Sequence, residues 1–177
     1  MWLALVTHPL LDAMTVYGTQ LLLPFTNHPF GVGSIFIIDL LYTLPLLVGV
    51  LVGVTRSAWG GLPWVYAGLA VSTAYLAWSA AAQWHVRGVA QASLAEPVPP
   101  GSLLVTPAPF NTLLWRVVVM RPDGSFDEGF RSLFDGDRPI RWDRFATEPA
   151  PASLRALPAV QRLATFSHGF HKVHAEG

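Results

Sequence analysis

The first 43 residues place a histidine and two carboxylates in a segment that is otherwise apolar. His8 and Asp12 lie in the run Thr7–Asp12, and Asp39 begins the run Asp39–Thr43. Burying ionisable groups in hydrocarbon costs several kcal/mol unless something compensates for the lost hydration. A bound metal ion, a proton relay or a hydrogen-bond network could each provide that compensation, and the choice among them is the functional question.

His8 and Asp12 are four residues apart, so on a helix they share one face and are separated by about 6 Å of rise. Imidazole nitrogen and carboxylate oxygen are ligands of zinc and similar divalent ions. The spacing therefore predicts two metal ligands, His8 and Asp12. An alternative stays open, in which Asp12 only orients His8 or both side chains face interfacial water.

Asp39 stands at the start of a long apolar stretch. We predict a catalytic role for it, either as a third ligand or as a general base for a metal-activated water. The alternative is a carboxylate at a helix start, where the helix dipole favours negative charge. Solvent exposure or interfacial anchoring is the expected state of the other histidines: His28, His85, His168, His171 and His174.

Charge is distributed very unevenly along the 177 residues, of which 52% are hydrophobic. Before residue 87 the only charged side chains are those of Asp12, Asp39 and Arg56. This pattern indicates lipid around the first half and water around the second. The chain has no cysteine, which excludes disulfides and thiolate metal sites. No basic patch with interleaved aromatics is present, so we expect no direct binding of nucleic acid.

The apolar pattern predicts three membrane-embedded elements. Residues 2–24 are expected to form an apolar N-terminal helix that is either the end of a membrane helix or a helix lying partly in the interface. Residues 24–34, which contain prolines and glycines, form a loop. Residues 35–54 and 63–86 are the two expected spans of a transmembrane hairpin, because twenty helical residues cover roughly 30 Å of hydrocarbon. Small residues in the second span would permit close helix packing.

The second half predicts a small soluble α+β region. We expect strands at 103–106, 115–120 and 125–134, because valine-rich and alternating segments flank a Pro-Asp-Gly turn at 122–124. A helix is expected at 152–165. The predicted fold class is thus an α-helical integral membrane segment followed by an α+β region, divided into residues 1–87, a proline-containing linker at 88–100, and residues 101–177.

Several motifs resemble the bacterial membrane-bound, metal-dependent hydrolase family, also described as LexA-binding, inner-membrane-associated hydrolases. The resemblance extends over most of residues 7–120. It rests on Thr7–Asp12 with Thr15, Tyr17–Gln20 and Leu23–Phe25, on Gly33–Asp39 and Tyr42–Pro45, and on Thr106, Pro107 and Pro109–Val117.

The resemblance implies a multi-pass protein of the bacterial inner membrane with a divalent-metal site, and His8, Asp12 and Asp39 match the polar motif residues of the family. Members also carry an upstream His-Arg-Gly and Thr-His-Ser motif, which this sequence lacks. We therefore expect a shortened member or one lacking its N-terminal region, with an incomplete metal site. Two functions remain open. One is metal-dependent hydrolysis, and the other is a non-catalytic membrane protein whose soluble part binds a protein partner such as LexA.

Overall fold

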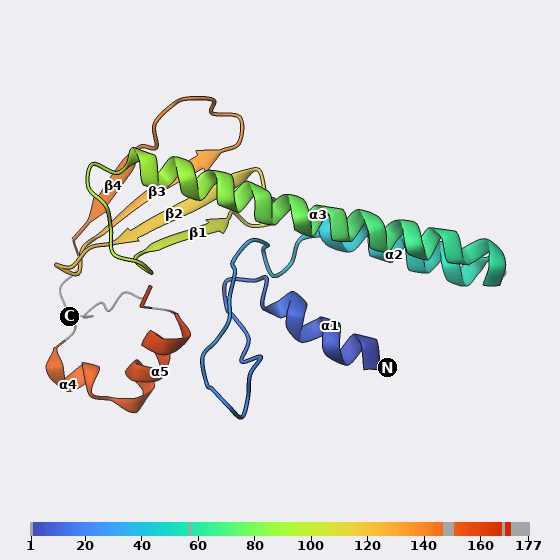
Figure 1. Ribbon diagram of the computed structural model, residues 1–177, viewed down its shortest axis with the longest axis horizontal. Coiled ribbons are helices and arrows are strands. Elements are labelled where there is room, and N and C mark those ends of the chain that lie inside the picture. Colours follow the sequence, from blue (N-terminus) through green and yellow to red (C-terminus); the bar gives the residue numbers. More distant parts are fainter. Residues whose placement is uncertain (1, 57, 147–150, 168, 171–177) are drawn as a thin grey trace, which may run out of the picture.

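The computed structural model describes residues 2–56, 58–146, 151–167, 169 and 170. An N-terminal helix α1 is followed by an irregular segment, a helical pair, a four-stranded sheet and two short helices, so the chain combines helices with an antiparallel sheet (Figure 1). The bounds are α1 Trp2–Asp12, α2 Leu40–Thr55, α3 Ala58–Ser93, β1 Leu103–Pro107, β2 Leu114–Met120, β3 Phe126–Ser132, β4 Trp142–Phe145, α4 Ala152–Arg155 and α5 Pro158–Phe166.

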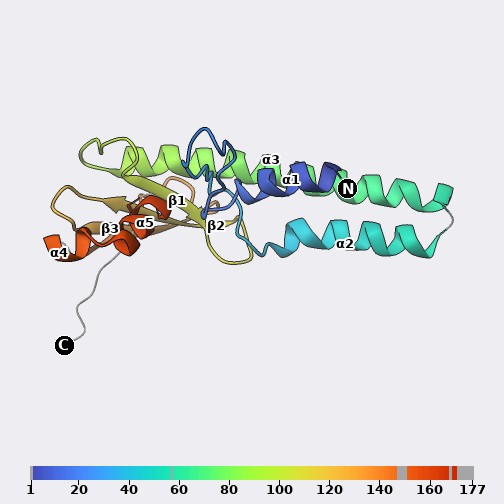
Figure 2. The same cartoon turned by 90° about the horizontal axis from the view of Figure 1, so that it is seen from below.

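Helices α2 and α3 lie side by side and form a hairpin that projects from the sheet (Figures 1 and 2). Their contact is built on glycine. A Cβ added at Gly49 would lie 2.7 Å from the Trp64 carbonyl oxygen, and one added at Gly68 would overlap the Pro45 carbonyl oxygen. Small residues at a helix contact permit this close backbone approach. The Ser72 hydroxyl also donates to the Tyr42 carbonyl oxygen at 2.7 Å.

The outer surface of the hairpin is apolar and exposed. Exposed large side chains on α2 are Leu40, Leu41, Leu44, Leu47, Val48, Val50, Leu51 and Val54, and those on the facing part of α3 are Trp59, Leu62, Trp64, Val65, Tyr66, Leu69, Val71 and Trp78. A soluble protein rarely exposes so large a continuous apolar surface. Among the described helices, α3 alone is long and apolar enough to cross a membrane, and α2 is a shorter apolar helix of 16 residues.

The second half of α3 covers one face of the sheet. Ala82, Val86 and Ala90, spaced four residues apart, form a buried core with residues of the sheet and the β3–β4 loop: Leu103, Val105, Trp115, Val117, Val119 and Ile140. A four-residue spacing keeps side chains on one helix face. A single helix therefore extends from the exposed hairpin into the sheet core.

The sheet is an antiparallel meander with strand order β1-β2-β3-β4. On β2, Trp115, Val117 and Val119 are buried against α3, whereas Leu114 and Arg116 are exposed. Val118, on the same face as Arg116, is buried as well. The three predicted strands are confirmed. The fourth strand, β4, was not predicted, and it pairs with β3 so that Phe145 stacks on Phe126 with ring centroids 5.0 Å apart.

Several predicted helix boundaries differ from the structure. The N-terminal helix expected over residues 2–24 ends at Asp12, and residues 13–39 are not helical. The second span, expected from residue 63, begins at Ala58. Residues 35–39 are not helical, because Asp39 caps a helix that begins only at Leu40. Helix α3 continues past residue 86 to Ser93, where the sheet supports it, and so occupies the start of the expected linker. The expected helix at 152–165 is divided into α4 and α5, and Pro158 begins the second of them. Proline suits the first turn of a helix and not its interior.

Candidate metal pair and buried carboxylate at the hairpin base

His8 and Asp12 lie together on α1, as their spacing predicts. The His8 Nε2 and Asp12 Oδ2 atoms are 3.4 Å apart, and the two side chains are 76% and 47% exposed. Beyond Asp12 the helix ends, and the Thr15 backbone N–H and hydroxyl both donate to the Asp12 carbonyl oxygen. The pair is thus an accessible imidazole and carboxylate at the C-terminal end of an apolar helix.

The separation within this pair fits two ligands of one divalent ion. Two donors at about 2.1 Å from a tetrahedral zinc ion lie about 3.4 Å from each other. A direct hydrogen bond between a nitrogen and an oxygen would be shorter, at about 2.7–3.2 Å. The donor types and their spacing therefore suit a metal, but they supply only two of the three protein ligands that a catalytic zinc usually has.

Asp39 has a different environment, because its carboxylate is only 2% exposed and is fully engaged in hydrogen bonds. Its Oδ1 accepts from the Leu41 N–H at 2.9 Å and the Tyr42 N–H at 3.3 Å. These bonds make Asp39 the N-cap of α2, where a carboxylate satisfies free backbone donors and complements the helix dipole. The alternative interpretation of Asp39 as a helix-start carboxylate thus describes its contacts.

The other oxygen of Asp39 connects the hairpin to the soluble part. Asp39 Oδ2 accepts from the Tyr75 hydroxyl of α3 at 2.9 Å, and the Tyr75 oxygen accepts from the Thr112 hydroxyl at 3.2 Å. Thr112 is buried and lies in the β1–β2 loop. A single chain of hydrogen bonds therefore joins the start of α2, the middle of α3 and a loop of the sheet.

Sequence reasoning missed Tyr75 and Thr112. Tyr75 lies in no charged or histidine-containing motif, and Thr112 belongs to the run Pro109–Val117, to which no site role was assigned. Both reach Asp39 only because the hairpin and the sheet fold together. The one local signal is a hydroxyl-bearing residue, Tyr75, within an apolar helix that also contains Ser72 and Ser79. Buried hydroxyls and carboxylates require partners, so such residues indicate a polar contact between elements.

A second polar contact holds the segment between α1 and α2 against α3. The buried Gln83 side-chain amide donates to the Val32 carbonyl oxygen at 2.7 Å and to the Val105 carbonyl oxygen at 2.9 Å. Val32 and Ser34 in turn donate their backbone N–H groups to the Ala13 and Met14 carbonyl oxygens. The end of α1, and with it the His8–Asp12 pair, is therefore positioned through Gln83.

The structure does not gather a larger ligand cluster in the part of the chain that it describes. No group of three or more His, Cys, Asp or Glu side chains suited to a metal occurs there. His28 is exposed and its ring contacts Phe30 edge-on, and His85 is exposed on α3. His168, His171 and His174 lie outside the described residues. The assignments of His8 and Asp12 as ligands and of Asp39 as catalytic remain predictions.

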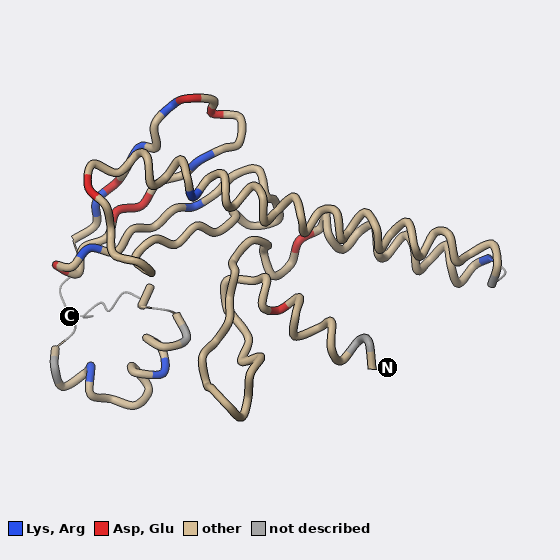
Figure 3. Tube along the Cα trace, viewed as in Figure 1, with Lys and Arg blue, Asp and Glu red and all other residues tan. Residues whose placement is uncertain are grey.

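Charged residues gather on the sheet and its loops, whereas the hairpin has charge only at its tip and its base (Figure 3). Residues 1–86 match the sequence profile of the YdjM inner membrane protein family. No curated protein and no solved structure matches the chain. The comparison thus agrees with the predicted resemblance to an inner-membrane family over the N-terminal half, which contains α1, α2 and most of the apolar part of α3.

Proposed function

We propose that this chain is an inner-membrane protein in which the α2–α3 hairpin lies in the bilayer and holds the sheet at one membrane surface. One observation carries this proposal: the hairpin buries glycines where its two helices meet and exposes large apolar side chains on its outside. The exposed side chains are leucines, valines and tryptophans. In water this arrangement would expose a large apolar surface, whereas in lipid it places apolar atoms against acyl chains. The likeness of residues 1–86 to an inner membrane protein family supports the same assignment.

The absence of native cysteine permits a direct topology test. If the hairpin crosses the bilayer, a cysteine replacing Arg56 at its tip and one replacing Pro122 in the β2–β3 turn will lie on opposite sides. A membrane-impermeant maleimide should then label only one of the two variants in intact spheroplasts, and both after lysis. Labelling of both before lysis, or release of the protein from membranes by alkaline carbonate, would refute a membrane-crossing hairpin.

Within this framework we propose metal-dependent hydrolysis as the activity, with His8 and Asp12 as two of the ligands. Their 3.4 Å separation and their exposure at the end of α1 support binding of a divalent ion such as zinc. The chemistry that such an ion supplies is acidification of water to a nucleophile near neutral pH. A general-base role for Asp39 requires its Oδ2 to exchange the Tyr75 hydroxyl for another donor.

Metal content tests the ligand assignment independently of any substrate. The full chain, purified in detergent and equilibrated with zinc, should retain metal, and His8→Ala and Asp12→Ala should each lower the retained zinc at least tenfold. His28→Ala is the matched control, since His28 is another exposed histidine of the N-terminal region. Equal metal in the parent and all three variants would remove His8 and Asp12 as ligands.

A second candidate function is recruitment of a protein partner by the sheet. The sheet face opposite α3 exposes aromatic side chains: Phe130 is 54% exposed and Phe145 is 39% exposed, beside the Arg116–Glu128 ion pair. Exposed aromatics with an adjacent arginine are typical of protein interfaces. LexA is the partner that the family resemblance suggests. The test is binding of purified LexA to the protein in nanodiscs. Binding that is lost in Phe130→Ser and retained in His8→Ala would favour this function. No binding to the parent would refute it.

A further inference from the structure

We propose that the loop between β1 and β2, residues 108–113, lies in the membrane interface and presents Phe110 and Leu113 to lipid. This inference rests on the proposed embedding of the hairpin and adds a second, separate membrane contact made by the sheet. Phe110 is 53% exposed and Leu113 is 40% exposed, although both belong to a loop whose neighbouring residue Thr112 is 1% exposed. The loop therefore turns apolar side chains outward while burying its hydroxyl.

The loop is tied to the base of the hairpin at the level of Asp39. Thr112 donates to Tyr75, which donates to Asp39 at the start of α2. The ring of Phe110 also packs edge-on against Phe36, with centroids 5.4 Å apart. Phe36 precedes Ile37 and Ile38, which are 57% and 60% exposed. Apolar side chains from the loop and from the entry to α2 thus form one continuous exposed patch.

The length of the hairpin places this patch at the lipid boundary. About twenty helical residues are needed to cover roughly 30 Å of hydrocarbon. Counted from Ala58 at the hairpin tip, twenty residues of α3 end at Ala77, two residues after Tyr75. Trp78 follows and is 50% exposed, as suits an aromatic at the headgroup level. The Thr112–Tyr75 contact therefore falls where hydrocarbon meets headgroups.

The backbone of the loop fixes the direction of Phe110. Phe110 has a φ of +65°, the left-handed region that non-glycine residues rarely adopt. Asn111 holds this conformation, because its Oδ1 accepts from the Leu113 and Leu114 N–H groups and its Nδ2 donates to the Pro109 carbonyl oxygen. An unfavourable backbone conformation that displays an exposed aromatic ring points to a function for that ring.

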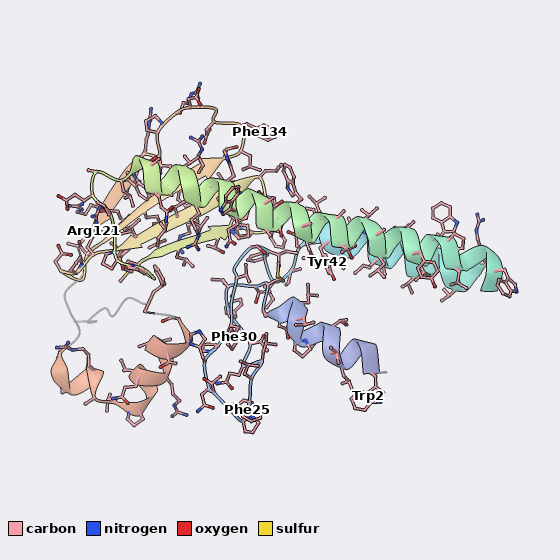
Figure 4. The ribbon with its side chains drawn as sticks, in the orientation of Figure 1. Trp2, Phe25, Phe30, Tyr42, Arg121 and Phe134 are labelled. Carbon is pink, nitrogen blue, oxygen red and sulfur yellow. The ribbon has the colours of Figure 1, made fainter. Side chains whose placement is uncertain are left out.

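Phe134, which follows β3, adds a third aromatic side chain to this patch. The Leu133 N–H donates to the Leu113 carbonyl oxygen, so the residues after β3 lie beside the loop. Phe134, which follows, is 81% exposed, and Figure 4 shows it near the end of the sheet from which α3 continues toward the hairpin. In contrast, the β2–β3 turn at the opposite end of the sheet contains Pro122, Asp123 and Gly124 and has no large apolar side chain.

Site-directed spin labelling in lipid nanodiscs tests the inference. Nitroxides would be attached to single cysteines at Phe110 and, in a second variant that keeps Phe110, at Leu113. Leu47→Cys on the hairpin and Pro122→Cys in the far turn serve as lipid and water references. We expect labels at 110 and 113 to be at least threefold more accessible to oxygen than to a water-soluble nickel chelate, relative to the label at 122.

Each other outcome has a distinct meaning. If the label at 47 reports lipid while those at 110 and 113 match the label at 122, the loop does not touch the membrane and the inference fails while the membrane anchor stands. If the label at 47 also reports water, the proposed embedding itself fails. Low accessibility to both reagents at 110 and 113 would mean that a protein surface covers the loop, which also overturns the inference.

Discussion

Asp127 is the most strongly paired carboxylate of the sheet. It is 3% exposed, and its oxygens accept from Arg144 Nε at 2.7 Å and from Arg121 Nη2 at 2.6 Å. The hydrogen bond from Arg144, followed by that from Arg121, holds the pKa of Asp127 below its usual value. Protonating Asp127 would leave both guanidinium groups without their partner, so its charge contributes to stability.

The sign of the resulting pH dependence follows from this lowered pKa. The stabilisation by Asp127 is complete above the unfolded-state pKa of about 3.9 and is lost as the pH falls through the lower folded-state pKa. At pH 7 we expect Asp127→Asn to lower the free energy of unfolding by about 1–3 kcal/mol, since one arginine is well exposed and screened. The acid-induced loss of stability should also be smaller in this variant than in the parent.

Thermal unfolding of the detergent-solubilised chain, followed by near-ultraviolet circular dichroism between pH 7 and pH 3, measures both effects. Asp137→Asn, in the exposed part of the β3–β4 loop, is the control and should follow the parent at every pH. Identical pH profiles for the parent and Asp127→Asn would contradict the role given to this carboxylate.

Single residues also show what the sequence could and could not predict. The closeness of His8 and Asp12 follows from helical spacing alone, and the structure reproduces it. The capping role of Asp39 was open in the sequence, because a carboxylate before an apolar run is a helix-start signal. Its bond to Tyr75 could not be predicted, since that contact depends on the register of α2 against α3 and no local pattern encodes it.

At the scale of elements, the hairpin depends on the absence of side chains where α2 and α3 meet. A Cβ at Gly68 would overlap the Pro45 carbonyl oxygen, whereas one at Gly88, farther along the same helix, meets nothing within 4 Å. Alanine favours a helix over glycine by about 1 kcal/mol, so intrinsic propensity would stabilise both variants. Steric overlap opposes this gain only at Gly68, where overpacking costs about 1–3 kcal/mol.

We therefore predict that Gly68→Ala lowers the melting temperature of the chain in detergent, whereas Gly88→Ala leaves it unchanged or raises it. Both variants make the same glycine-to-alanine change on α3, so they gain the same helix propensity. A difference between their melting temperatures therefore reports helix packing. A melting temperature raised equally by both substitutions would show that the α2–α3 contact is looser than the glycine geometry indicates.

Elements whose pattern is local were predicted well, and those that depend on a neighbour were not. The valine-rich β2 and its turn to β3 are recognisable from alternation and from Pro-Asp-Gly. The short strand β4 carries Asp143 and Arg144 between two aromatics and gives no such signal, because it is defined by pairing with β3. Helix α3 exceeds its predicted end because Val86 and Ala90 pack on the sheet, a contact that hydropathy does not report.

At the scale of the whole molecule, helix α3 joins the α2–α3 hairpin to the core of the sheet, and Gln83 is the residue at which the N-terminal segment is attached to that helix. The Gln83 side-chain amide donates hydrogen bonds to two carbonyl oxygens, that of Val32 in the N-terminal segment and that of Val105 in β1. The Val32 N–H donates to the carbonyl oxygen of Ala13, which directly follows Asp12. The hydrogen bonds of Gln83 therefore help to set the position of the candidate metal pair relative to the sheet. Buried polar groups with satisfied partners fix the relative position of elements more than they add stability.

Replacing Gln83 with leucine keeps the side chain's approximate volume but leaves two carbonyl oxygens without this donor. We predict faster amide hydrogen exchange at Val32, Ser34 and the end of α1 in nanodiscs, with exchange within α2 unchanged, since α2 is held by its glycine contact with α3. Gln91→Leu, an exposed position on the same helix, should exchange as the parent does.

Zinc retention should fall in Gln83→Leu but not in Gln91→Leu if the pair at His8 and Asp12 receives its remaining ligands from elsewhere in the assembled protein. Unchanged exchange around Val32 in Gln83→Leu would contradict this role of Gln83. The N-terminal helix would then be positioned without α3, by the backbone hydrogen bonds between residues 13–15 and 32–35 and the packing around them.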